Sequence, residues 1–212
     1  MTASRLGLYN GALAILGERK LASLTENREP RRVLDDIWDE GAVGYCLEQG
    51  LWNFAMRSVE LSADPDVSPQ FGYRNAFSKP SDYVRTAAVA SDEYFNSPLT
   101  QYSDEAGYWW ADIDPLYVKF VSNGASYGAD FAKWPGTFTL FVEHYLAHRA
   151  CTRLTQSKTD KEQIKKDMKK ALTDARSKDA MNEPASFLPS GSWSAARRGG
   201  SGGDRTGPRL IG

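Results

Sequence analysis

The chain has 212 residues, enough for one hydrophobic core with extensions. Its 26 basic and 27 acidic residues nearly cancel, but they are unevenly distributed. Residues 1–157 hold 14 basic and 20 acidic residues, whereas residues 158–212 hold 12 and 7, a net charge of +5. We therefore expect one domain followed by a tail, with the C-terminal quarter facing a different partner from the rest.

The cysteine content and hydropathy exclude two broad classes. Cys46 and Cys151 are far apart in the sequence, which is typical of a reducing compartment rather than a disulfide framework. No apolar run reaches the roughly eighteen residues of a membrane span, and residues 1–10 lack the pattern of a signal peptide. We expect a protein made in a cytoplasm, with no membrane partner.

A first helix is predicted over about residues 4–16. Ser4 can cap its start, and Gly17 can end it in the left-handed conformation. Its apolar residues recur at helical spacing: Leu6, Tyr9, Leu13 and Leu16.

A second helix is predicted over about residues 28–50, because Pro30 is tolerated only in a first turn and Gly50 can end the helix. One apolar stripe should face the first helix; it comprises Leu34, Trp38, Ala42 and Tyr45, broadened by Val33, Ile37 and Leu47.

The periodicity becomes alternating after Trp52, which predicts a small antiparallel β unit over about residues 54–130. Residues 54–62 form the first expected strand, and residues 71–91 form an extended element that is interrupted at Lys79-Pro80. A strand pair is expected around Asp114-Pro115, followed by a tight turn at Asn123-Gly124.

Two further helices are predicted, over about residues 136–157 and 160–181. The former is apolar on two sides and should lie in the middle of a bundle; its residues are Phe138, Phe141, Val142 and Tyr145, then Leu140, Ala147, Cys151 and Leu154. The latter should open with a capping box, Thr159 with Glu162, and bury Ile164, Met168, Ala171, Leu172 and Ala175. Its lysines are interpreted as a solvated face, with proximity to DNA or to an acidic neighbour as the alternative: Lys158, Lys161, Lys165, Lys166, Lys169 and Lys170.

Residues 184–212 cannot build a core, because they are mostly glycine, serine and arginine with isolated apolar residues. We interpret them as an extended C-terminal arm that is ordered by a partner; a solvated tail without fixed structure is the alternative. The sequence thus predicts an α+β fold, with a bundle of about four helices, an inserted β unit and this arm.

Residues 5–157 resemble the head-to-tail adaptors of tailed bacteriophages, known as tail tubular protein A or head completion proteins. The resemblance begins with Leu16-Gly17-Glu18, the leucine-rich loop Leu21–Leu24 and the corner Trp52-Asn53-Phe54. A second block matches at Tyr73, Arg74, Pro80, Asp82, Val84 and Arg85. A third block matches at Asp130, Trp134, Pro135, Phe138, Glu143, Leu146, Ala147 and Leu154.

The resemblance implies a structural virion protein without cofactors. Such adaptors form a ring of twelve copies beneath the portal protein, extend the channel for genomic double-stranded DNA, and dock the tail nozzle or tail tube. The protein would then lie at the head-tail junction of a virion assembled in the host cytoplasm. The arm would contact the portal through Trp193, Arg197, Arg198, Arg205, Arg209, Leu210 and Ile211. A loop with Tyr94, Phe95 and Tyr102 would dock the tail.

Other classes of function compete with this interpretation. A zinc site is conceivable from His144, His148 and Cys151 with Cys46, but no paired Cys-x-x-Cys spacing supports it. The chain has no phosphate loop, nucleophile elbow or dinucleotide motif, so we expect neither an enzyme nor a metal or cofactor. A nucleic-acid-binding protein would use the basic helix, the tail arginines and a stacking platform, and a carbohydrate-binding module would use the same platform: Tyr108, Trp109 and Trp110.

Overall fold

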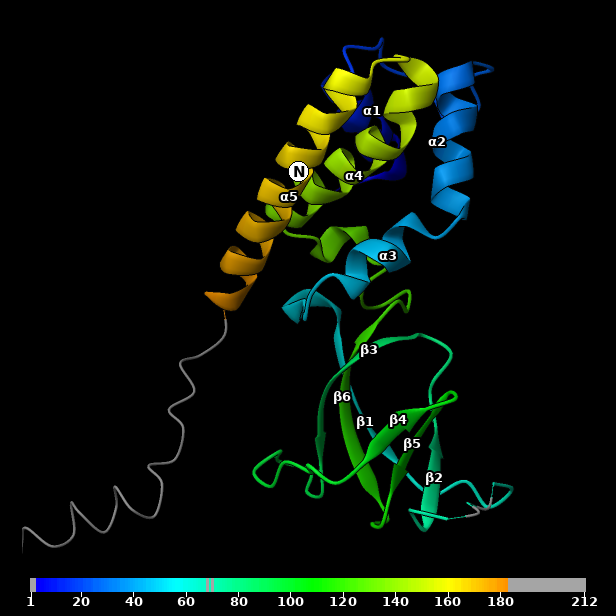
Figure 1. Ribbon diagram of the computed structural model, residues 1–212, viewed down its shortest axis with the longest axis vertical. Coiled ribbons are helices and arrows are strands. Elements are labelled where there is room, and N and C mark those ends of the chain that lie inside the picture. Colours follow the sequence, from blue (N-terminus) through cyan, green and yellow to red (C-terminus); the bar gives the residue numbers. More distant parts are fainter. Residues whose placement is uncertain (1–2, 68, 70, 183–212) are drawn as a thin grey trace, which may run out of the picture. The chain divides into compact units, whose positions relative to one another are not determined.

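The structure is a computed structural model that describes residues 3–67, 69 and 71–182, and it has the α+β fold that the sequence predicts. The chain divides into a unit of residues 1–182 and a unit of residues 183–212; the predicted arm lies outside the described residues. The helices are α1 (Arg5–Ile15), α2 (Glu29–Asp39), α3 (Ala42–Glu48), α4 (Gly136–Leu154) and α5 (Lys158–Ala180) (Figure 1). The strands are β1 (Met56–Leu61), β2 (Asn75–Ser78), β3 (Tyr83–Ala90), β4 (Ser103–Glu105), β5 (Tyr108–Ala111) and β6 (Leu116–Ser122).

The first helix begins and ends as predicted. The Ser4 hydroxyl accepts a hydrogen bond from the Gly7 amide at 3.1 Å, which satisfies one of the free amides of the first turn. Gly17 has a φ of 72°, the left-handed conformation that a residue without Cβ adopts at little cost.

The prediction of a single helix over residues 28–50 is wrong, because the chain forms α2 and α3 instead. Pro30 lies in the first turn of α2 as expected, but Gly41 has a φ of 93° and interrupts the helix. The change of direction removes Tyr45 from the predicted buried stripe, so that 43% of its surface is exposed and its ring stacks on Tyr145.

Helix α4 lies in the middle of the bundle, as predicted, and contacts α1, α2, α3 and α5. One predicted core residue is wrong: Leu140 is 47% exposed, because it points away from the packed sides of the helix. The predicted capping box of the next helix is also wrong. Ser157 caps α5 by accepting a hydrogen bond from the Asp160 amide at 3.2 Å, which places Thr159 inside the first turn.

The β unit contains two antiparallel sheets, with the strand orders β1-β6-β3 and β2-β5-β4. Strands β5 and β6 flank Asp114-Pro115 as expected, but they belong to different sheets, so the predicted pairing around this site is wrong. The two sheets share a core separate from that of the bundle: Phe77, Val89, Trp109, Ala111, Leu116, Val118 and Phe120.

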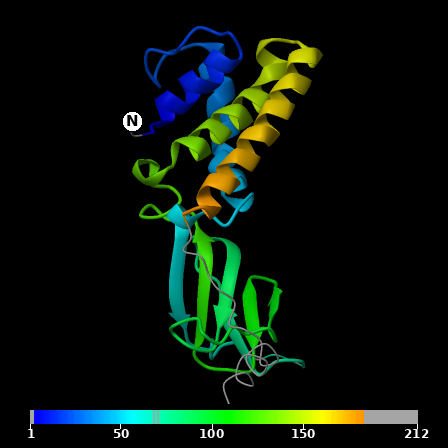
Figure 2. The same ribbon diagram turned by 90° about the vertical axis from the view of Figure 1, so that its left-hand side faces the viewer.

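The corner Trp52-Asn53-Phe54 connects α3 to β1 through a short 3-10 turn (Figure 2). Trp52 is buried, and its indole N–H donates to the Cys46 carbonyl at 3.2 Å. The backbone amide of Asn53 donates to the Asp179 carboxylate at 3.0 Å, so the end of α5 is bonded to this corner. The corner is therefore a structural joint.

Candidate functional site

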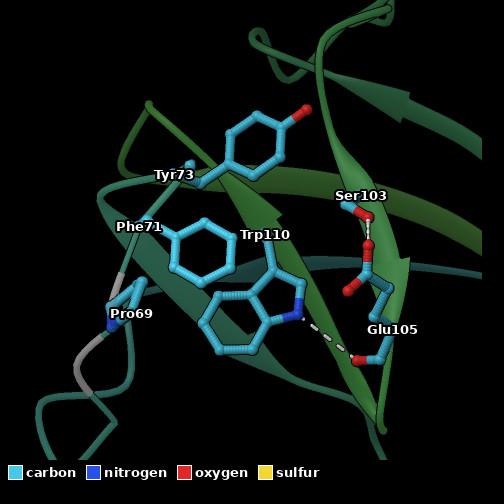
Figure 3. Close-up of a pocket in the computed structure, with 7 residues that line it drawn as sticks. Pro69, Phe71, Tyr73, Ser103, Glu105 and Trp110 are labelled. Atoms are coloured by element: carbon cyan, nitrogen blue, oxygen red, sulfur yellow. Dashed lines mark hydrogen bonds between the residues drawn. The ribbon is translucent and has the colours of Figure 1, made fainter.

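A pocket with several aromatic side chains lies on the β unit (Figure 3). Its cavity volume is about 340 Å³, and we call it the aromatic pocket. It is lined by Pro69, Phe71, Gly72, Tyr73, Ser103, Glu105 and Trp110.

The pocket wall is produced by the alternation of side chains along the second sheet. Ser103 on β4 is the cross-strand partner of Trp110 on β5, so both side chains lie on one face, while Trp109 lies on the other. The Trp110 indole N–H donates to the Glu105 carbonyl at 3.3 Å, and the Ser103 hydroxyl donates to the Glu105 carboxylate. These bonds fix the indole and the carboxylate beside each other (Figure 3).

Phe71 is the most exposed large apolar side chain on the described part of the chain, at 89%. In Figure 3 its ring lies next to the Trp110 indole, with Tyr73 on the same side of the pocket. Burial of a phenylalanine side chain is favourable, because it removes apolar surface from water. An exposed phenylalanine is therefore a candidate contact point for a ligand or another protein.

The β unit carries the acidic excess of the first three quarters of the chain. Residues 56–130 contain 5 basic and 11 acidic residues, a net charge of −6. This equals the whole imbalance of residues 1–157, so the rest of that range, with 9 basic and 9 acidic residues, is neutral. The pocket thus lies in the most acidic part of the molecule, where the field favours cations.

The structure contradicts one residue of the predicted stacking platform. Trp109 is fully buried and donates its indole N–H to the Thr86 hydroxyl at 3.0 Å, so it belongs to the core and is unavailable to a ligand. Tyr108 and Trp110 lie on the opposite face, with ring centroids 5.7 Å apart. Phe71 was not predicted as a site residue. It lies in a turn-rich stretch, whose sequence does not indicate that its side chain lines the same pocket as Trp110.

Tyr94, Phe95 and Tyr102, the predicted tail-docking residues, are not among the residues that line this pocket. Tyr94 is 74% exposed, and Phe95 has a positive φ of 56°. Tyr102 is partly buried against the core of the β unit. The Asp92 carboxylate accepts hydrogen bonds from the Asn96 and Ser97 amides and thereby holds the loop closed.

A groove of about 560 Å³ lies between α1 and α4 and holds the carboxylate of Glu143. Gly11 makes room for this carboxyl group, since a Cβ there would lie 2.2 Å from the Glu143 Cδ atom. Burial raises the pKa of Glu143. Leu140 lines the same groove and adds an exposed apolar contact.

The conceivable zinc ligands do not assemble. Within residues 3–67, 69 and 71–182 no group of three or more His, Cys, Asp or Glu side chains is placed to hold a metal ion. Burial raises the pKa of the Cys46 thiol, and it lowers the pKa of His144. Burial likewise lowers the pKa of His148, with help from Lys161.

Asp82 directly precedes β3, and its carboxylate is bonded to the other two strands of the first sheet. The Arg57 guanidinium on β1 donates to both carboxylate oxygens of Asp82, at 2.7 and 2.8 Å, and the Ser122 hydroxyl on β6 donates to the same group. Burial raises the pKa of Asp82, but the hydrogen bonds from Ser122 and Arg57 outweigh it, so the pKa lies below its ordinary value of 3.8.

This lowered pKa predicts acid sensitivity. A carboxylate whose folded-state pKa is depressed stabilises the fold above the unfolded-state pKa, and the contribution is lost as the pH falls through the folded-state pKa. We expect the free energy of unfolding to be reduced below about pH 4, with a smaller reduction in Asp82→Asn. Urea denaturation at a series of pH values measures this; identical pH profiles of the two proteins would contradict it.

The predicted portal contacts, from Trp193 to Ile211, lie outside the described residues. Among the described helices, none is long and apolar enough to cross a membrane. Comparisons of this chain with protein-family models and with curated proteins found no match.

Proposed function

We propose that this protein is a head-to-tail adaptor of a tailed bacteriophage, a non-enzymatic ring component beneath the portal protein. The observation that carries the proposal is the place of the resembling motifs in the fold. Leu16-Gly17-Glu18 follows α1, Trp52-Asn53-Phe54 connects the bundle to the β unit, and Trp134-Pro135 leads into α4. The motifs lie where one element of the fold connects to the next. Matching motifs at these connections would give two proteins the same order and direction of elements.

A ring needs two different contact faces on each copy. The helical bundle exposes a large apolar side chain at two places, Leu140 on α4 and Tyr45 on α3. Leu140 and Glu143 line the groove with α1, whereas Tyr145 stacks on the exposed Tyr45. We propose that these two faces meet in adjacent copies of a twelve-membered ring.

The remaining partners follow from the same role. The arm of residues 184–212 would attach the ring to the portal, the β unit would face the nozzle or tail tube, and double-stranded DNA would pass through the channel. The net charge of −6 on the β unit suits a channel that lets DNA slide without strong phosphate binding.

Native mass spectrometry of the protein, alone and co-expressed with its portal protein, tests the proposal. We expect a closed ring of about twelve copies when the portal is present, by the resemblance and the symmetry of such assemblies. Electron microscopy of the same sample would show whether the ring is coaxial with the portal. Persistent monomers that do not bind the portal would refute the adaptor role.

A second candidate function is nucleic-acid binding by α5. Its lysines Lys165, Lys166, Lys169 and Lys170 are exposed, and among the described residues none of the four forms an ion pair. Retention of the isolated protein on DNA that weakens steeply with added salt would favour this alternative.

A further inference from the structure

In this fold a cation repeatedly contacts both an aromatic ring and a carboxylate. Arg5 contacts Trp38 and Asp35, Arg57 contacts Phe120 and Asp82, and Lys79 contacts Tyr83 and Asp104. The distances from the cation to the ring centroid are 5.2, 5.9 and 4.2 Å, respectively, within the range of favourable cation–π contacts.

The aromatic pocket has two of these three components. Its lining offers the rings of Phe71, Tyr73 and Trp110 and the carboxylate of Glu105, but no basic residue. The Trp110 indole N–H is already satisfied by a carbonyl within the sheet, so the ring face rather than the polar edge is left for a partner.

We propose that the aromatic pocket binds an arginine side chain presented by a basic surface of another protein. A planar guanidinium can stack on an aromatic face and donate to a carboxylate at the same time, which a lysine ammonium does less well. The net charge of −6 on the β unit would attract such a surface before contact.

A neutral sugar is the competing ligand, because its apolar face would also stack on these rings. It would leave the charge of Glu105 uncompensated, however, and it would gain nothing from the acidic field of the β unit. The charge of the site therefore favours the arginine.

The proposal is tested on the full-length chain, labelled with ¹⁵N, by titration with the blocked peptide acetyl-Gly-Arg-Gly-amide at low salt. The indole N–H signal of Trp110 should move, while that of the buried Trp109 should not. The matched peptide carries citrulline, which has nearly the same shape as arginine but no charge. Its affinity should be lower by about fivefold. Added salt should weaken binding of the arginine peptide.

Two variants examine the pocket residues separately. Glu105→Gln keeps the size of the side chain but removes its charge, and Phe71→Ala removes an exposed ring. Each should weaken binding of the arginine peptide by about two- to fivefold while the melting temperature stays unchanged. Tyr94→Ala, which removes an exposed ring elsewhere on the β unit, is the control and should bind normally.

Three results would overturn the proposal: equal binding of the arginine and citrulline peptides, an unchanged affinity in Glu105→Gln, or a Trp110 shift caused by maltotriose but not by the arginine peptide. The inference goes beyond the adaptor role and does not depend on it. Peptide binding is measured without portal protein, so failure of ring assembly would leave the result intact.

Discussion

Trp52→Ala should lower the free energy of unfolding by about 3–5 kcal/mol, the usual cost of emptying a buried aromatic site. Trp52 is only 1% exposed, and its ring packs edge-on against Phe138 at a centroid distance of 4.8 Å. The substitution also leaves the Cys46 carbonyl without its indole donor. Gly50 packs directly against the same ring and has no side chain that could fill the cavity.

Urea denaturation followed by circular dichroism measures this loss. Leu51→Ala is the matched control, since its side chain is exposed beside the same corner, and it should change the free energy by no more than about 0.5 kcal/mol. A Trp52→Ala protein with the midpoint of the parent would show that the corner does not join the two parts of the fold.

Deletion of residues 185–212 should abolish stable attachment to the portal while the unfolding midpoint of the remaining chain stays unchanged. The helices and strands of residues 3–182, and the core residues identified among them, all lie before residue 183. The deleted sequence contains isolated large apolar residues and four arginines in a glycine- and serine-rich background. Such residues stabilise a complex only when another protein covers them.

Co-purification of the truncated protein with portal protein measures attachment. Trp193→Ala in the full chain examines the apolar anchor, and replacement of Arg197 and Arg198 by alanine examines the charged contacts. Undiminished binding of the truncated protein would mean that the folded domain, rather than the arm, carries the principal portal contact.

The local sequence determined the features that depend on single residues or short repeats. Ser4 and Gly17 mark the ends of α1, and Pro30 marks the first turn of α2, because caps and prolines act within one helical turn. The change from helical to alternating periodicity after Trp52 likewise located the β unit, since side-chain period reports secondary structure directly.

The candidate site was predicted only in part, because its residues come from different strands and loops. Trp110 was among the predicted platform residues, but Trp109 was wrongly grouped with it, since neighbouring residues on a strand face opposite sides. The face of β5 that is buried depends on the other sheet, which contains β6. Phe120 on β6 packs near Trp109.

The sequence by itself determined the fold class, most of the helix ends and the buried role of Trp52. Only the tertiary structure decided that Gly41 divides the second helix, since an isolated glycine is tolerated within many helices. The tertiary structure also separated β5 and β6 into different sheets and placed Phe71 and Trp110 in the lining of one pocket. These features depend on contacts between residues far apart in the chain. A local sequence pattern cannot predict the free energies of such contacts.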